Sequence, residues 1–184
     1  MRVISGTAKG RKLKSVPGSS TRPVMDRVKV ALFDILAGEM QDCLFLDLFA
    51  GTGGVGIEAL SRGARRVFFV DIDPKAIQTI RENLKTTRLE ERAAVMRSDS
   101  FRFLDRAEHE SFDMIYVAPP QYKGLWRKAL EQVDRVDSWL SPDGIVVVQI
   151  DPKEACEIHL EHLKEFDRRQ YGSTLLCFFE KPGE

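Results

Sequence analysis

The sequence predicts an α/β fold with a doubly wound, mostly parallel seven-stranded sheet, and three features of the 184-residue chain support this prediction. Short apolar runs alternate with amphipathic segments from Cys43 onward. A glycine-rich turn follows the first run, and a chain of this length can bury roughly two thirds of its unfolded surface. Strands that alternate with helices join through right-handed crossovers, so helices should cover both faces of the sheet.

The first 20 residues are expected to form a basic hairpin arm, and residues 21–184 the domain that contains the sheet. Residues 2–5 and 11–16 carry alternating or β-prone side chains around two glycines, which is the pattern of a hairpin. Proline, glycine and serine at residues 17–20 then separate the hairpin from the next element.

The elements of the domain follow from apolar periodicity and from end signals. A helix is expected from Pro23 to about Ala37, because hydroxyl side chains precede the proline and Asp26 lies in the first turn. Five apolar runs are expected to be parallel strands, at residues 43–48, 67–70, 93–96, 112–117 and 145–150. The amphipathic segments between them are expected to be helices, at residues 54–62, 74–85, 100–107 and 125–139. Residues 166–171 and 174–179 flank a Gly-Ser turn and predict a final hairpin, which gives the sheet one antiparallel strand.

Charge is balanced over the whole chain, with 28 Lys and Arg against 28 Asp and Glu, but it is unevenly distributed. Residues 1–30 hold eight basic side chains and one acid, which gives +7 there and −7 in the remainder. The eight are Arg2, Lys9, Arg11, Lys12, Lys14, Arg22, Arg27 and Lys29. A basic arm on an acidic body indicates a polyanionic partner, and the alternative is an ordinary solvated hairpin.

Cysteine and histidine positions argue against a disulfide framework or a metal site. Cys43, Cys156 and Cys177 are odd in number and far apart, and the three histidines have no ligand spacing to a carboxylate. No apolar run approaches the roughly 20 residues of a membrane span, and the first residues do not resemble a signal peptide. We therefore expect a cytoplasmic protein that binds no metal.

A glycine-rich turn at residues 47–56, Asp-Leu-Phe-Ala-Gly-Thr-Gly-Gly-Val-Gly, connects the first predicted strand to a helix. Its G-x-G-x-x-G pattern at the first strand-to-helix turn predicts a loop for a nucleotide-type cofactor, and the alternative is a tight turn without a ligand. Asp47 would repel the pyrophosphate of a dinucleotide but favour the sulfonium and ammonium groups of S-adenosylmethionine. No Gly-Lys-Ser/Thr follows, so a Walker-type loop is excluded.

Two further aspartates follow the next two strands. Asp71, twenty residues after Gly51, can accept both hydroxyls of an adenosine ribose, and Asp99 can accept a hydrogen bond from the adenine amino group. Either could be only a helix N-cap, the role expected for Asp73 before the helix at Pro74. Three acids that end three successive strands nevertheless lie along the edge where ligands bind in such sheets.

The fourth apolar run ends in Ala118-Pro119-Pro120-Gln121-Tyr122, where the sequence resembles the amino methyltransferases. Their motif is Asp, Asn or Ser, then two prolines and an aromatic residue. The polar side chain and a carbonyl of the proline region accept hydrogen bonds from an exocyclic amino group, which localises its delocalised lone pair. The aromatic residue stacks on the flipped-out base.

This chain departs from that motif at two positions. Ala118 replaces the polar acceptor and Gln121 replaces the aromatic residue, with Tyr122 one place late. The Ala118 carbonyl remains available, and Tyr122 supplies a stacking face if the loop is re-aimed. Loss of one such hydrogen bond costs about 2–4 kcal/mol of transition-state stabilisation, so reduced or altered activity is the alternative expectation.

Several motifs together resemble the RsmD family of bacterial 16S ribosomal RNA guanine-N2 methyltransferases. They are Arg2-Val-Ile-Ser-Gly with Gly10-Arg-Lys-Leu, Thr21-Arg-Pro with Asp26-Arg27, Leu32-Phe-Asp-Ile-Leu, the turn from Asp47, and Glu58-Ala-Leu-Ser-Arg-Gly-Ala. The resemblance covers nearly the whole chain. It implies a class I methyltransferase fold, S-adenosylmethionine as methyl donor, and RNA contacts from the basic hairpin.

The resemblance also implies roles for particular residues, although position 71 is usually Glu in the family. Cofactor contacts are expected from Asp47, Phe49, Gly51, Thr52, Gly53, Asp71, Ile72, Asp99 and Ser100. Catalytic roles are expected for Ala118, Pro119, Pro120, Tyr122 and Arg22. RNA contacts are expected from Lys9, Arg11, Lys12, Lys14, Arg22 and Arg27.

The expected function is transfer of a methyl group from S-adenosylmethionine to the N2 atom of a guanine in 16S rRNA. The expected partner is small-subunit rRNA or the assembling small ribosomal subunit, with no membrane and with a monomer as the default state. Two alternatives stay open: a catalytically weak or silent RNA-binding module that keeps the cofactor pocket, and an amino methyltransferase that acts on another nucleic acid. A nicotinamide enzyme is a remote further alternative.

Overall fold

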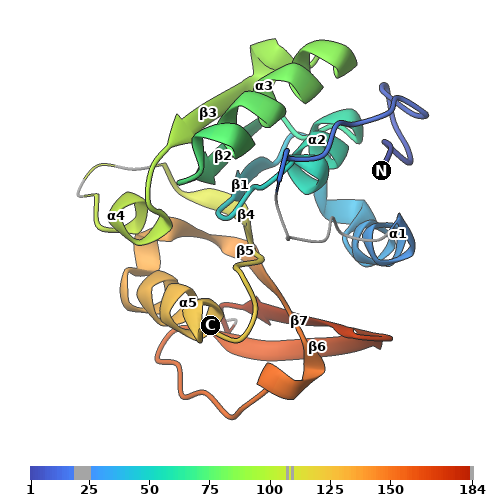
Figure 1. Ribbon diagram of the computed structural model, residues 1–184. Coiled ribbons are helices and arrows are strands. Elements are labelled where there is room, and N and C mark those ends of the chain that lie inside the picture. Colours follow the sequence, from blue (N-terminus) through green and yellow to red (C-terminus); the bar gives the residue numbers. More distant parts are fainter. Residues whose placement is uncertain (19–25, 107, 109, 183–184) are drawn as a thin grey trace.

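The computed structural model describes residues 1–18, 26–106, 108 and 110–182, and within them the predicted sheet is confirmed. Seven strands lie in the order β3-β2-β1-β4-β5-β7-β6. They are β1 (Leu44–Asp47), β2 (Arg66–Asp71), β3 (Ala93–Arg97), β4 (Phe112–Val117), β5 (Leu140–Ile150), β6 (Lys164–Tyr171) and β7 (Thr174–Glu180). The pairs among β1 to β5 are parallel, whereas β7 runs antiparallel to both β5 and β6 (Figure 1).

Helices cover both faces of the sheet, as the strand-helix alternation predicts. They are α1 (Asp26–Ile35), α2 (Gly54–Ser61), α3 (Pro74–Thr87), α4 (Ser100–Leu104) and α5 (Leu125–Arg135), with short 3-10 turns η1 (Ala37–Glu39), η2 (Glu90–Arg92), η3 (Asp137–Trp139) and η4 (Pro152–Glu154). The first three helices share one core with Phe45 of β1, and α4 and α5 share the other with Leu44 and Leu46 (Figure 1). Within the described residues, no helix is both long enough and apolar enough to span a bilayer.

Three predicted element boundaries are wrong. The fifth strand begins at Leu140 rather than residue 145, because Leu140 pairs with Phe112 and the ladder resumes only at Met114 and Ile145. The turn-forming residues 141–144 therefore form an irregularity inside the strand. Helix α5 ends at Arg135 rather than residue 139, since Trp139 is fully buried and its Nε1 donates to the Leu104 carbonyl at 3.2 Å. The predicted helix at 100–107 is also shorter, because α4 ends at Leu104.

The N-terminal hairpin is shorter than predicted and is packed onto the sheet domain. A single antiparallel bridge joins Arg2 and Lys12, and the Val3 N–H donates to the Arg11 carbonyl at 3.0 Å. Val3, Ala8 and Leu13 are buried in the core that contains α1, α2 and α3. The segment is therefore held by burial of its apolar side, and its basic side chains face outward. The predicted start of the first helix at Pro23 lies outside the described residues.

A buried carboxylate, Glu58 of α2, fixes this segment to the body. Its two oxygens accept the N–H groups of Ile4 and Ser5 at 2.8 and 2.9 Å. The same carboxylate lies 3.3 Å from the Nζ of Lys29, and both side chains are fully buried. Lys29 is thus removed from the basic surface that the sequence indicates, and its Nζ also donates to the Arg2 carbonyl at 2.6 Å. Arg62 completes the network, with its Nε 2.9 Å from Glu58.

Candidate active site at the carboxyl edge of the sheet

The predicted cofactor residues and the Pro-Pro turn lie at one edge of the sheet. Asp47 and Asp71 end the neighbouring parallel strands β1 and β2, and Asp99 follows β3. Ala118 follows β4, which pairs with the other side of β1. The carboxyl ends of adjacent parallel strands form the crevice in which open α/β sheets bind ligands.

The glycine-rich loop leaves open space beside its backbone. Gly51 has a φ of +53°, and a Cβ placed on it would meet no heavy atom within 4 Å. The Gly51 N–H donates to the Asp71 Oδ2 at 2.8 Å, so the second strand fixes the loop. Gly56 has a different role, because a Cβ there would lie 2.4 Å from the Phe69 ring of β2. At Gly51 the loop therefore presents bare backbone to open space, while α2 packs tightly on the sheet.

Asp47 lies beneath this loop rather than in an open crevice. It is buried, and its Oδ2 accepts the Gly56 N–H at 3.1 Å. Burial raises the pKa of Asp47 from 3.8 to about 7, the Gly56 hydrogen bond opposes this rise, and the Asp71 carboxylate adds to it. Asp47 thus holds the start of α2, and a nearby positive charge would lower its pKa again.

The Asp47 pKa predicts a pH-dependent loss of stability. Between about pH 4 and pH 7 the folded chain keeps this proton while the unfolded chain has released it, so the contribution of Asp47 to the free energy of unfolding falls as pH rises. Asp47→Asn keeps an acceptor for Gly56 but cannot ionise. We expect the unfolding free energy of wild type minus that of the variant to fall by roughly 2–4 kcal/mol across this window. Urea titrations at several pH values measure it, and a flat difference would contradict the burial argument.

The second strand end presents acceptors and an apolar surface. Asp71 accepts the Asp73 N–H on Oδ1 at 2.9 Å and the Gly51 N–H on Oδ2, which leaves further lone pairs on both oxygens. Ile72 is 62% exposed, an unusual state for a large apolar side chain next to a loop of this type. Asp73 accepts the Lys75 N–H at 2.8 Å, which confirms its predicted role as the N-cap of α3.

Asp99 both caps a helix and faces a cavity. Its Oδ1 accepts the N–H groups of Phe101 and Arg102 at 3.0 Å, and in the described part of the chain its Oδ2 has no hydrogen-bond partner. A cavity of about 440 Å³ is lined by Ile72, Arg97, Ser98, Asp99 and Arg102. Asp99 is therefore an N-cap through Oδ1, and its Oδ2 remains available as an acceptor at the cavity.

The remaining predicted cofactor residues hold the loops in place. Ser100 is buried, and its hydroxyl donates to the Leu48 carbonyl at 2.6 Å. Phe49 is half-buried with its ring edge-on to Phe101, centroids 6.1 Å apart. The Thr52 hydroxyl accepts the Gly54 N–H at 3.3 Å, and Gly53 has a left-handed φ of +73°.

The Pro-Pro turn leads to an exposed tyrosine that is held at both ends. Ala118 is half-buried, Pro119 is buried and Pro120 is exposed. Tyr122 has a φ of +60° and is 63% exposed. Its hydroxyl donates to the Asp151 Oδ2 at 2.7 Å, and this bond raises the pKa of Tyr122. The turn thus presents an aromatic ring at the site although its motif position is occupied by glutamine.

Asp151 and Glu154, which contact Tyr122, were missed by sequence reasoning. Glu154 accepts the Tyr122 N–H on Oε1 at 2.8 Å. Asp151 directly follows β5, so it carried the same signal as Asp71, an acid at the end of a parallel strand. The signal was overlooked because the cofactor motifs involve only the first four strands.

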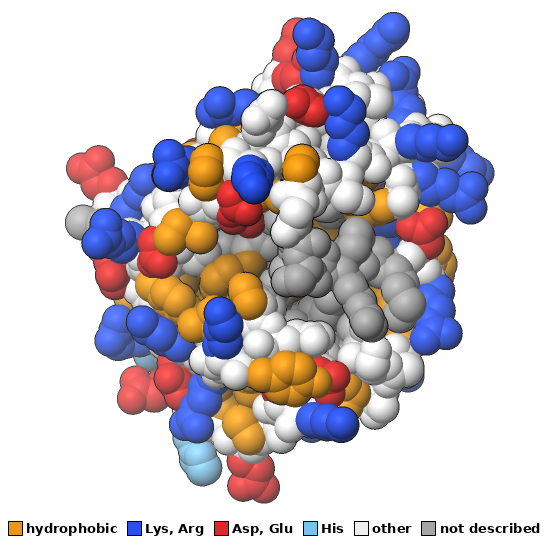
Figure 2. Space-filling view, in the orientation of Figure 1, with side chains coloured by type: hydrophobic (Ala, Val, Ile, Leu, Met, Phe, Trp, Pro, Cys, Tyr) orange, Lys and Arg blue, Asp and Glu red, His pale blue; other side chains and the backbone are white. Residues whose placement is uncertain are grey.

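The predicted RNA-contacting side chains form an exposed surface along the N-terminal segment and α3. Lys9, Arg11, Lys12 and Lys14 are all exposed. Lys14 pairs with Glu82 at 2.8 Å and Arg11 donates to the Thr86 carbonyl at 2.5 Å, which attaches both to α3. Figure 2 shows Lys and Arg side chains gathered at the upper right, where Figure 1 places these two elements.

Of the two remaining predicted RNA contacts, the structure describes only Arg27. Arg27 is exposed in α1, and its guanidinium lies beside Gly172 in the turn between β6 and β7. Arg22, which was predicted for both catalysis and RNA contact, lies outside the described residues.

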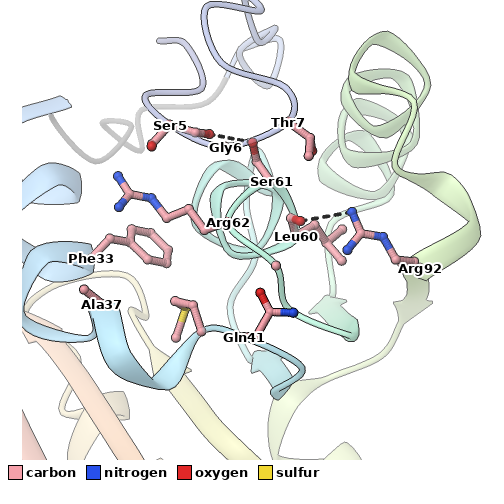
Figure 3. Close-up of a pocket in the computed structure, with 12 residues that line it drawn as sticks. Ser5, Gly6, Thr7, Phe33, Ala37, Gln41, Leu60, Ser61, Arg62 and Arg92 are labelled. Atoms are coloured by element: carbon pink, nitrogen blue, oxygen red, sulfur yellow. Dashed lines mark hydrogen bonds between the residues drawn. The ribbon is translucent and has the colours of Figure 1, made fainter.

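A larger pocket, of about 670 Å³, lies at the opposite edge of the sheet (Figure 3). Its lining includes Gln41, Gly63 and Arg92, which precede β1, β2 and β3. Arg92 donates to the Leu60 and Ala64 carbonyls at the end of α2, so its donors serve the fold. Among the described residues, no group of three His, Cys, Asp or Glu side chains is placed to hold a metal ion.

Comparisons with known proteins agree with this geometry. Residues 1–180 match the model of a family described as conserved hypothetical protein 95. The chain is 42% identical to YlbH of Bacillus subtilis, a proposed rRNA methyltransferase, over all of both chains. It is 34% identical to ribosomal RNA small subunit methyltransferase D of Haemophilus influenzae over 81% of this chain and 78% of that protein. The solved structure of YhhF of Escherichia coli, a proposed methyltransferase, matches with a TM-score of 0.87 at 28% identity, and the match covers 98% of this chain and 97% of that one.

Proposed function

The chain belongs to the RsmD family of ribosomal RNA methyltransferases, and we propose that it transfers a methyl group from S-adenosylmethionine to the exocyclic N2 of a guanine in 16S rRNA. The observation that carries this proposal is the meeting of three elements at one sheet edge. They are the open backbone at Gly51, the acceptors Asp71 and Asp99, and the Pro-Pro turn with its exposed Tyr122.

The residues at this edge fit S-adenosylmethionine. The remaining lone pairs of Asp71 suit the two ribose hydroxyls, and the Asp99 Oδ2 suits the adenine amino group. Exposed Ile72 offers an apolar surface to the adenine ring, and the bare Gly51 backbone allows close approach. The bound cofactor supplies an electrophilic methyl group on its sulfonium sulfur. A dinucleotide fits less well, because the Gly51 N–H that would face its pyrophosphate already donates to the Asp71 carboxylate.

The base-handling residues follow from the chemistry of an aromatic amine. The lone pair of the amine nitrogen is delocalised into the ring. Backbone carbonyls in the 118–120 turn that accept hydrogen bonds from its N–H groups therefore make the nitrogen a better nucleophile. The Tyr122 ring offers a face for a base taken out of its stack. Holding the nitrogen in line with the methyl group supplies the remaining rate enhancement through orientation.

The proposal is tested by incubating the protein with methyl-labelled S-adenosylmethionine and small ribosomal subunits that lack the modification. The RNA is then digested and its nucleosides are identified by mass spectrometry. Label in N2-methylguanosine is the expected result. Label in another nucleoside would redirect the proposal to a different amino group, and bound cofactor without any label would overturn it.

A second function, an RNA-binding module with a weak or silent active site, is favoured by one observation, the alanine at position 118. Ala118→Asp restores the polar side chain of the amino methyltransferase motif. We expect the wild type to be active already and this variant to change the initial methylation rate by less than about tenfold, because backbone carbonyls and Tyr122 hold the base. A rise of two to three decades from a near-zero rate would establish the second function instead.

The basic surface should contribute affinity without sequence selectivity. Lys9 and Lys12 are exposed. We expect Lys9→Ala with Lys12→Ala to weaken RNA binding several-fold and to reduce the slope of log affinity against log salt by about 1.4–1.8. Filter binding at several salt concentrations measures this, with Lys164→Ala, an exposed lysine on β6, as the matched control. An unchanged slope would place the RNA elsewhere.

A further inference from the structure

The displaced aromatic residue of the catalytic turn is held by two carboxylates on a different segment. Both lie after β5, Asp151 at its end and Glu154 in η4. Asp151 accepts the Tyr122 hydroxyl at 2.7 Å, and Glu154 accepts the Tyr122 N–H at 2.8 Å. One bond fixes the tip of the ring and the other fixes the backbone, so the direction of the side chain is determined.

The two hydrogen bonds to Asp151 and Glu154, called here the Tyr122 clamp, hold a backbone conformation that a tyrosine rarely adopts. A φ of +60° brings the Cβ close to backbone atoms and is unfavourable for a residue other than glycine. The Asp151 carboxylate is itself oriented, because its Oδ1 accepts the Lys153 N–H at 2.9 Å. The strained backbone and the oriented acceptor together keep Tyr122 exposed rather than packed into the core.

Glu154 contributes little to the stability of the fold. Its Oε2 is buried and has no hydrogen-bond partner within the described residues. A buried acceptor without a donor costs free energy, and such a group in a folded protein calls for an explanation beyond packing. The contact that Glu154 does make is the one to the Tyr122 backbone.

We propose that Asp151 and Glu154 are positioning residues that hold the Tyr122 ring as the surface on which the target base stacks. The proposal rests on the proposed methyltransferase function. It explains how a chain with Gln121 at the motif position still presents an aromatic face. The face comes from the next residue, Tyr122, whose backbone has a positive φ. Base-aromatic stacking stabilises a bound base, and a ring fixed in advance loses less of this stabilisation to ordering.

The test compares Tyr122→Ala, Tyr122→Phe and Asp151→Ala in methylation kinetics and cofactor binding. We expect Tyr122→Ala to lower kcat/KM for the RNA substrate by about 10- to 100-fold, and each of the other two by about 3- to 10-fold, with unchanged cofactor affinity. Asp151→Ala should add nothing to Tyr122→Phe, because both remove the same bond. Asp151→Asn, which keeps an acceptor, should restore most of the loss, and Tyr171→Phe is the control for loss of a phenol.

Ultraviolet titration of the tyrosines is independent of activity. Asp151→Ala should lower the ionisation pH of one of the three tyrosines, since the Asp151 bond favours the protonated phenol. An active wild type with Tyr122→Phe and Asp151→Ala within twofold of it would overturn the positioning proposal and leave the methyltransferase function intact. If the wild type methylates no rRNA, the proposed function fails. The variants are then compared by their affinity for the small ribosomal subunit instead of by their methylation rate. Equal affinities of wild type and Tyr122→Ala would then overturn the stacking role as well.

Discussion

Glu58→Ala is expected to lower the free energy of unfolding by about 3–5 kcal/mol, because it leaves the ammonium of Lys29 buried without its counter-ion. Both side chains of the pair are fully buried, and Glu58 also accepts the N–H groups of Ile4 and Ser5. The loss should therefore loosen the contact of the N-terminal segment with α2 and weaken the core around it. Urea unfolding followed by circular dichroism measures the change.

An exposed ion pair provides the control for this experiment. The Lys14–Glu82 pair has side chains that are 66% and 39% exposed, so Glu82→Ala should leave the free energy of unfolding almost unchanged. If Glu58→Ala prevents folding, the double variant Lys29→Met with Glu58→Gln removes the stranded charge and should recover a folded protein. A Glu58→Ala loss no larger than that of Glu82→Ala would contradict the role assigned to the buried network.

Asp71→Ala is expected to weaken S-adenosylmethionine binding by at least about 30-fold. The substitution removes the acceptor proposed for the ribose hydroxyls and also the anchor of the Gly51 N–H. A hydrogen bond to a charged group contributes about 1.5–3 kcal/mol, and each 1.4 kcal/mol changes an affinity tenfold. Isothermal titration calorimetry with the cofactor measures the loss directly.

The neighbouring Asp73 is a matched control for Asp71. It lies two residues away but caps α3, and asparagine is an equally good N-cap, so Asp73→Asn should bind cofactor as the wild type does. The Asp71→Ala variant should keep its circular dichroism spectrum, which separates loss of binding from loss of fold. Cofactor affinity within threefold of wild type in Asp71→Ala would remove Asp71 from the site.

The sheet could be predicted because its signals are local. Apolar runs such as Phe112–Val117 and the glycine-rich turn mark strands and the first crossover within a few residues. The irregular part of β5 could not be predicted, since its turn-forming residues 141–144 enter the strand only through the pairing of Leu140 with Phe112. Trp139 was likewise assigned to a helix, although its contacts with Leu104 and Phe112 place it in the core.

The site was predictable in its positions but less so in its contacts. Asp71, Asp99 and the Pro-Pro turn lie at the expected edge, because strand order alone brings them there. The burial of Asp47 and of Lys29 depends on Gly56 and on Glu58, and no sequence pattern shows that these side chains end without access to solvent. The clamp on Tyr122 joins residues about thirty positions apart, which only the folded chain makes visible.

Nucleoside mass spectrometry of 16S rRNA from the host, with and without the gene for this protein, tests most directly whether this sheet edge catalyses methylation of guanine N2. We expect deletion to remove one N2-methylguanosine, and we expect the wild-type gene, but not the Asp71→Ala variant, to restore it. An N2-methylguanosine content that is unchanged by deletion would contradict the proposed function.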